Sequence, residues 1–87
     1  MPDTDRFETL AIHAVTYLLS DARTRDGFLG STGLEESAIR AGLENVGFLT
    51  GVLEYLLNRE DLLTDFCKQY GYPPEMPAKA LHALAQS

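Results

Sequence analysis

This chain has one cysteine that could act as a nucleophile, and two histidines, either of which could serve as the base that deprotonates it. A thiol at Cys67 would become a reactive thiolate if His13 or His82 lay next to it in the folded chain. A free cysteine also packs as a small apolar residue, and this interpretation requires no histidine nearby. We therefore expect Cys67 to be a half-buried structural residue, and a cysteine-dependent enzyme is the third alternative for the function.

Two further groups of residues could bind a metal ion or transfer protons. Helical periodicity places His13 and His82 on the polar sides of their helices, and neither has a second metal ligand one turn away. Four carboxylates surround one expected break between helices, and paired carboxylates can perform acid–base catalysis: Glu54, Glu60, Asp61 and Asp65. No phosphate-binding loop accompanies them, so we interpret them as a solvated face with acidic residues at a helix N-terminus. No catalytic residue, metal site, cofactor or small-molecule substrate is expected.

The segment FLGSTGLEESAIRAG, residues 28–42, has the outline of a DNA-binding helix-turn-helix with Gly33 at its turn. That motif needs a small residue four positions before the glycine, where this chain has Leu29. Its second helix would present Glu35 and Glu36 to DNA phosphates, which repel carboxylates. A helix ending at Gly33, followed by a new helix, explains the same residues. A nucleic-acid-binding or regulatory protein using residues 28–42 therefore remains the disfavoured alternative.

Gly47 and Gly51 are spaced one helical turn apart and line up with Tyr55. Glycine inside a helix costs about 1 kcal/mol relative to alanine, so it is retained where another backbone must come close. We favour a close crossing by another helix of the same domain. The alternative is a groove for a protein partner or for a second copy of the chain.

Aromatic residues and prolines are concentrated between residues 66 and 74. Phe66, Tyr70 and Tyr72 could form an apolar patch for a partner, or a lid over the core with Pro73 and Pro74. We favour the lid because a small domain has little apolar surface to spare. The candidate interaction surface of the chain comprises Gly47, Gly51, Tyr55, Tyr70 and Tyr72.

Apolar residues recur at three- and four-residue steps along the whole chain, and strand-like alternation is absent. This pattern predicts an all-α fold, a single compact bundle of five or six short helices formed by residues 1–87. The first helix is expected at about residues 4–20, and a second, capped by Ser20 or Asp21, ends at Gly33. A third opens at Glu35 and Glu36 and turns Ala38, Ile39 and Leu43 inward.

The helix expected at residues 45–58, capped by Asn45, is apolar around much of its circumference and should be the centre of the fold. A fifth helix would begin at Glu60 and end at Gly71. The seven-residue spacing of Leu49, Leu56 and Leu63 also allows one long bent helix across residues 45–70. A last helix is expected at about residues 77–86.

Composition limits the possible partners. Thirteen acidic residues against seven basic ones give a formal charge of −6, which provides no attraction to phosphates or anionic lipids. The start MPDTDRF lacks the charge and apolar run of a signal peptide, and a single cysteine suits a reducing compartment. We therefore expect a cytoplasmic protein that contacts no membrane, for which nucleic acid is a disfavoured partner.

The segments FLGSTGL and FLTGVLEYLLNREDLLTDFCKQYGYPPE, with the helical N-terminal part, resemble a small family known as domain of unknown function 3572. The resemblance covers nearly the whole chain and implies a compact helical protein of bacterial origin. It supplies no catalytic or binding residue. From the residues themselves, the leading functional prediction is a non-enzymatic protein-interaction module that acts through a helix groove or by forming a homodimer.

Overall fold

The computed structural model describes residues 2–86, which form six helices and no strand. These helices are α1 (Pro2–Leu19), α2 (Ala22–Thr32), α3 (Glu36–Gly42), α4 (Val46–Leu57), α5 (Glu60–Tyr70) and α6 (Met76–Ala85). The all-α single bundle predicted from the sequence is confirmed, with six helices. The first helix begins two residues earlier than expected.

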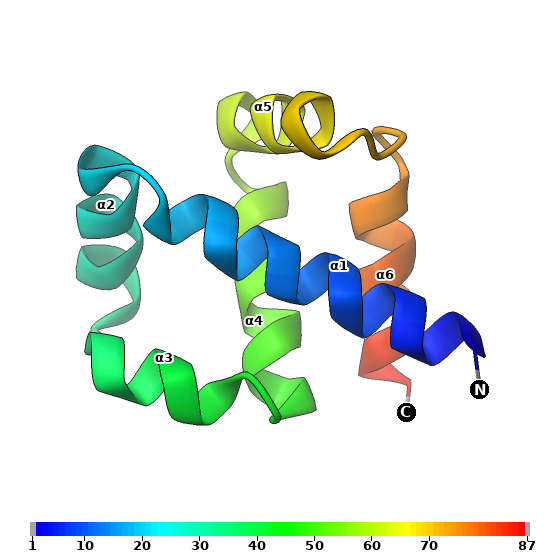
Figure 1. Cartoon of the computed structure of the whole chain (residues 1–87), viewed down its shortest axis with the longest axis horizontal. Helices are drawn as coiled ribbons and strands as arrows, with labels where there is room; N and C mark the ends of the chain where they lie inside the picture. Colours follow the sequence, from blue (N-terminus) through cyan, green and yellow to red (C-terminus); the bar gives the residue numbers. More distant parts are fainter. Residues whose placement is uncertain (1, 87) are drawn as a thin grey trace.

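Three helices build the centre of the bundle. α4 and α6 pack side by side, and α1 crosses over both of them (Figure 1). α5 covers one end of this layer, while α2 and α3 extend it on the side away from α6 (Figure 1). The fully buried side chains of α4 all lie on one side of that helix: Leu49, Val52, Leu53 and Leu56. The expected central position of α4 is therefore confirmed, although one side of α4 faces outward.

Helix ends follow local signals in the sequence. The Asp21 carboxylate accepts a hydrogen bond from the Thr24 backbone N–H at 3.1 Å, and Asn45 caps α4 in the same way. Gly33 ends α2 with φ 72°, a left-handed conformation that glycine adopts without a steric penalty. Gly71 ends α5 with φ 74°. The open choice between Ser20 and Asp21 is thus resolved in favour of Asp21.

The boundary between α4 and α5 is a true break. Asn58 still donates its N–H to the Glu54 carbonyl, but Arg59 has φ −119° and ψ 87°, which no α-helix accommodates. The single long bent helix is therefore wrong. One prediction about α3 is also wrong: Ile39 is buried and Leu43 is half-buried, whereas Ala38 is exposed, because neighbouring residues of a helix point about 100° apart and Ala38 points away from the core.

Candidate functional site

Gly47 and Gly51 lie on the outward side of α4, where both residues are exposed. Apart from its chain neighbours and the backbone of its own helix, a Cβ atom added at Gly51 would meet no atom within 4 Å. At Gly47 its near neighbour would be the Asn45 Oδ1 atom, at 3.1 Å. The close crossing by another helix of the same domain is therefore wrong, because no packed element approaches these positions. The two glycines instead leave a strip of the α4 backbone uncovered.

An apolar cavity of about 140 Å³ opens beside this strip. Its lining comes from α2, the residues after α2, and α4: Phe28, Thr32, Leu34, Phe48, Gly51 and Val52. Phe28 and Val52 are each 1 % exposed and form its deepest part, whereas Leu34 and Phe48 are half-buried. A side chain at position 51 would occupy space next to this cavity, so glycine there helps to keep its mouth open.

Tyr55 lies one turn beyond Gly51 and is half-buried. Its ring packs edge-on against Phe28, with the ring centroids 5.1 Å apart, and this contact attaches α2 to α4. Tyr55 therefore supports the same aromatic residue that lines the cavity. We call Gly47, Gly51, Tyr55 and the cavity beside them the glycine face.

Tyr70 and Tyr72 belong to a different part of the molecule. Both are half-buried and pack on the fully buried ring of Phe66, at centroid distances of 5.1 and 5.6 Å. The two tyrosines cover the core as the predicted lid requires, whereas Pro73 and Pro74, also predicted to belong to it, are exposed. Tyr70 and Tyr72 contact His13 and Phe66, whereas Tyr55 contacts Phe28, so the structure divides the candidate residues between two groups of contacts.

His13 was expected on the polar side of α1, and this expectation is wrong. The ring is half-buried, stacks on Tyr70 at 5.2 Å, and its Nδ1 atom shares a hydrogen bond of 2.7 Å with the Tyr72 hydroxyl. Burial raises the pKa of Tyr72, and the neighbouring Tyr70 adds to this effect. His13 is separated from Tyr72 by 59 residues, so no local pattern in the sequence could have revealed the contact.

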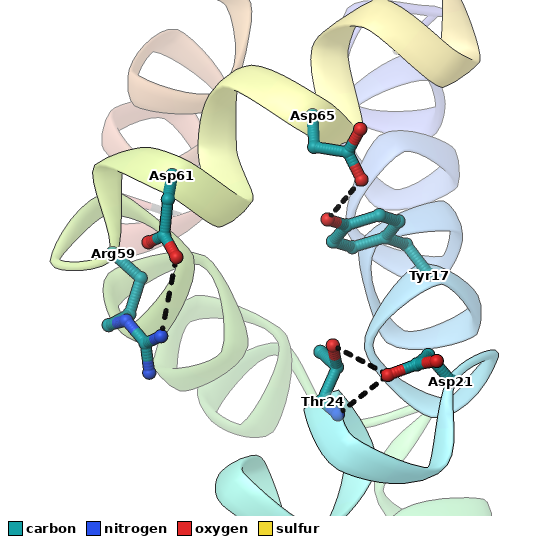
Figure 2. Close-up of polar contacts among 6 residues, drawn as sticks. All are labelled: Tyr17, Asp21, Thr24, Arg59, Asp61 and Asp65. Atoms are coloured by element: carbon teal, nitrogen blue, oxygen red, sulfur yellow. Dashed lines mark hydrogen bonds and ion pairs between the residues drawn. The ribbon is translucent and has the colours of Figure 1, made fainter.

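The Tyr17 hydroxyl donates a hydrogen bond of 2.7 Å to an oxygen of the Asp65 carboxylate, which joins α1 to α5 (Figure 2). Asp65 also accepts from the Gln69 amide at 2.9 Å. Burial and then this bond to Asp65 raise the pKa of Tyr17, because both disfavour the phenolate. The sequence showed Asp65 as part of a solvated acidic face, and its interaction with Tyr17 was missed.

The other acidic residues of that group are solvated as expected. Glu54, Glu60 and Asp61 are exposed, and Asp61 pairs with Arg59 at 3.5 Å (Figure 2). The Arg59 guanidinium holds the pKa of Asp61 below its usual value. An exposed pair of this kind contributes little to stability.

Cys67 is buried, with 6 % of its surface exposed, which is deeper than the half-buried position expected. Its thiol lies 3.8 Å from the Pro73 carbonyl oxygen, to which it can donate. Burial raises the pKa of the Cys67 thiol, and the charge of Glu75 adds to this effect. A nucleophilic thiolate needs the opposite shift. Of the two histidines considered as its base, His13 is hydrogen-bonded to Tyr72, and His82 is exposed and hydrogen-bonded to Gln86.

Within the part of the chain that the structure describes, no three histidine, cysteine, aspartate or glutamate side chains are grouped as a metal site would require. In the same residues, no helix combines the length and the apolar character needed to span a bilayer.

Comparison with known proteins identifies a family. The family model described as "Protein of unknown function (DUF3572)" matches residues 4–87, nearly the whole chain. The chain belongs to this family, and the resemblance noted in the sequence is confirmed. No match was found among curated proteins or among solved structures.

Proposed function

We propose that this member of the DUF3572 family is a non-enzymatic protein-interaction module that binds a protein partner through the glycine face of α4. One observation carries the proposal: Gly51 is exposed on a helix, has open space around it, and borders an apolar cavity. Glycine in the middle of a helix costs about 1 kcal/mol relative to alanine. Since nothing in the domain occupies the space, a close approach from outside accounts for that cost.

The cavity indicates what a partner would present. Its floor, formed by Phe28 and Val52, is apolar, and its volume of about 140 Å³ is similar to an engineered apolar cavity that binds benzene. One aliphatic or aromatic side chain of a partner could therefore enter it while the partner's backbone lies along Gly47 and Gly51. Such an anchored side chain in a small apolar pocket is typical of the residues that dominate binding energy at interfaces.

We propose a non-enzymatic role because the candidate reactive side chains are buried, hydrogen-bonded within the domain, or exposed to solvent. Cys67 is buried with a raised thiol pKa, and Asp65 is hydrogen-bonded to Tyr17. Glu54 and Glu60 lie exposed on the surface, where carboxylates are ordinarily solvated.

Gly51→Leu tests the proposal because it fills the space at the glycine face. Gly30→Leu is the matched control: Gly30 is also exposed, lies in α2, and has nothing within 4 Å of an added Cβ. The wild-type chain and both variants would be used to capture cross-linked partners from native cytosol. We expect wild type and Gly30→Leu to retain the same partner, and Gly51→Leu to lose it without unfolding.

Circular dichroism would establish that the two leucine variants are equally folded. Equal capture of the same partner by Gly51→Leu and Gly30→Leu would overturn the glycine face as the binding site. If no partner is retained by the wild-type chain, the interaction module itself is overturned.

A further inference from the structure

A second apolar depression, separate from the glycine face, lies between α1 and α3. It has a volume of about 530 Å³, and its apolar walls are aliphatic side chains of α1, α3 and the residue that follows α3: Ile12, Leu19, Ile39 and Leu43. Among the side chains of residues 5–86, Ile12 is the one large hydrophobic that is exposed, with 38 % of its surface accessible. We call this depression the α1–α3 groove. In this groove the most exposed large apolar side chain of the described residues, Ile12, lies beside α3.

Two opposite charges line the same groove. Glu36 and Arg40 are exposed, both border the groove, and are four residues apart on one face of α3. Arg40 has no ion pair in the described residues, and Glu36 is paired with Arg25 at 3.7 Å between exposed side chains. A pair of that kind leaves Glu36 available to a second cation. The groove thus offers one anion and one cation, about 6 Å apart along the helix axis.

This charge order is complementary to itself when the helix direction is reversed. If a two-fold axis places α3 antiparallel to α3 of another molecule, Glu36 of each chain faces Arg40 of the other. A two-fold interface is built from the same patch on both chains, so both contacts form together. A partner helix with a single charge would satisfy only one of the two residues.

We infer that the α1–α3 groove is the face through which two copies of this chain pair, with their α3 helices antiparallel. Ser37, which also lines the groove and is exposed on α3, is small enough to let the two helices come close. Ile12 and Leu43 of each chain would cover apolar surface of the other. The interface carries one positive and one negative charge from each chain, so it adds no net repulsion. This inference goes beyond the proposed function because it uses a different surface and a different partner.

The expected dimer is weak. A helix of seven residues is only about 10 Å long, so the interface belongs to the small class of protein contacts, with dissociation at roughly micromolar concentrations or above. Sedimentation velocity and light scattering from about 1 µM to about 1 mM cover this range. The wild-type chain should shift from monomer to dimer with increasing concentration. A monomer throughout the range would overturn the inference.

Charge reversal separates this interface from any other. Arg40→Glu places two anions on the groove face, and Glu36→Arg places two cations there. Each variant alone should dissociate about tenfold to thirtyfold more readily than wild type, because two attractions become two repulsions. Mixed in equal amounts, the two variants should form a heterodimer, since every anion then faces a cation. Lys79→Glu, an exposed charge reversal on α6, is the control and should dimerise as wild type.

The glycine-face variant keeps the two proposals distinguishable. Gly51→Leu should form the same dimer as the wild-type chain, even if it loses its protein partner. A dimer abolished by Gly51→Leu, or unaffected by both charge reversals, would overturn pairing through α3. Circular dichroism of each variant would confirm that its helices are intact.

Discussion

Changing three helical glycines to alanine should give three different results, and the structure sets the sign of each. Alanine is favoured over glycine in a helix interior by about 1 kcal/mol. At Gly51, in the middle of α4, the new Cβ meets nothing within 4 Å, so the whole gain should be realised. Gly51→Ala should therefore raise the unfolding free energy by roughly 0.5–1 kcal/mol, or the melting temperature by about 4 °C.

Gly30 and Gly42 provide the two comparisons. Gly30 has equal space but lies two residues before the end of α2, so Gly30→Ala should stabilise by a smaller amount. At Gly42 the new Cβ would lie 2.7 Å from Cγ of the Phe48 ring, closer than real Cβ contacts come. Phe48 would have to move, and overpacking of this kind costs about 1–3 kcal/mol. Gly42→Ala should therefore destabilise the domain.

Urea unfolding followed by circular dichroism measures all three variants against wild type, with the midpoint as the readout. The reasoning requires the order Gly51→Ala, Gly30→Ala, wild type, Gly42→Ala, from most to least stable. A destabilised Gly51→Ala would refute it, because the loss would mean that the space beside Gly51 is occupied within the domain. The exposed glycine that supports the proposed binding face would then have an internal explanation.

Two further predictions concern buried groups that titrate. The folded chain keeps the phenol protons of Tyr17 and Tyr72 to a higher pH than the unfolded chain does. The contribution of these two groups to the free energy of unfolding is therefore complete below the ordinary tyrosine pKa of 10.0, and it is lost as the pH rises above that value. Urea midpoints measured across this range should fall, and less steeply for Tyr17→Phe; equal slopes would contradict the raised pKa of Tyr17. The Cys67 thiol should react with a disulfide reagent at neutral pH far more slowly in the folded than in the urea-unfolded chain, since it is buried and its pKa is raised. A folded-state rate at or above that of free cysteine would contradict this and favour a reactive thiol.

The helices could be predicted from the sequence because their signals are local. Asp21 and Asn45 cap helices through the backbone N–H three residues later, and Gly33 and Gly71 adopt the left-handed conformation that ends a helix. The break between α4 and α5 was harder to predict. A seven-residue apolar spacing runs through residues 49–70, and it persists whether the chain bends or breaks. The conformation of Arg59 decides between these two, and periodicity says nothing about it.

The contacts that connect the helices could not be predicted. Tyr17 reaches Asp65 across 48 residues, and His13 reaches Tyr72 across 59. Each pair is brought together by the way α1 crosses the bundle, which depends on how all the helices pack at once. Periodicity assigned His13 to a polar face because a histidine between apolar positions has the same spacing whether water or a tyrosine lies beside it.

The packing of the helices also decides what lies beside Gly47 and Gly51, and for this reason the predicted close crossing by another helix was wrong. α4 is apolar around so much of its circumference that the sequence favoured covering it on all sides. In the structure, however, its buried residues lie on one side, and Gly47 and Gly51 lie on the other. A helix that is central by composition but carries exposed glycines along one side leaves backbone there that its own domain does not cover. This uncovered backbone borders the apolar cavity beside Gly51, and for that reason an expectation that failed for the fold supports the proposed function.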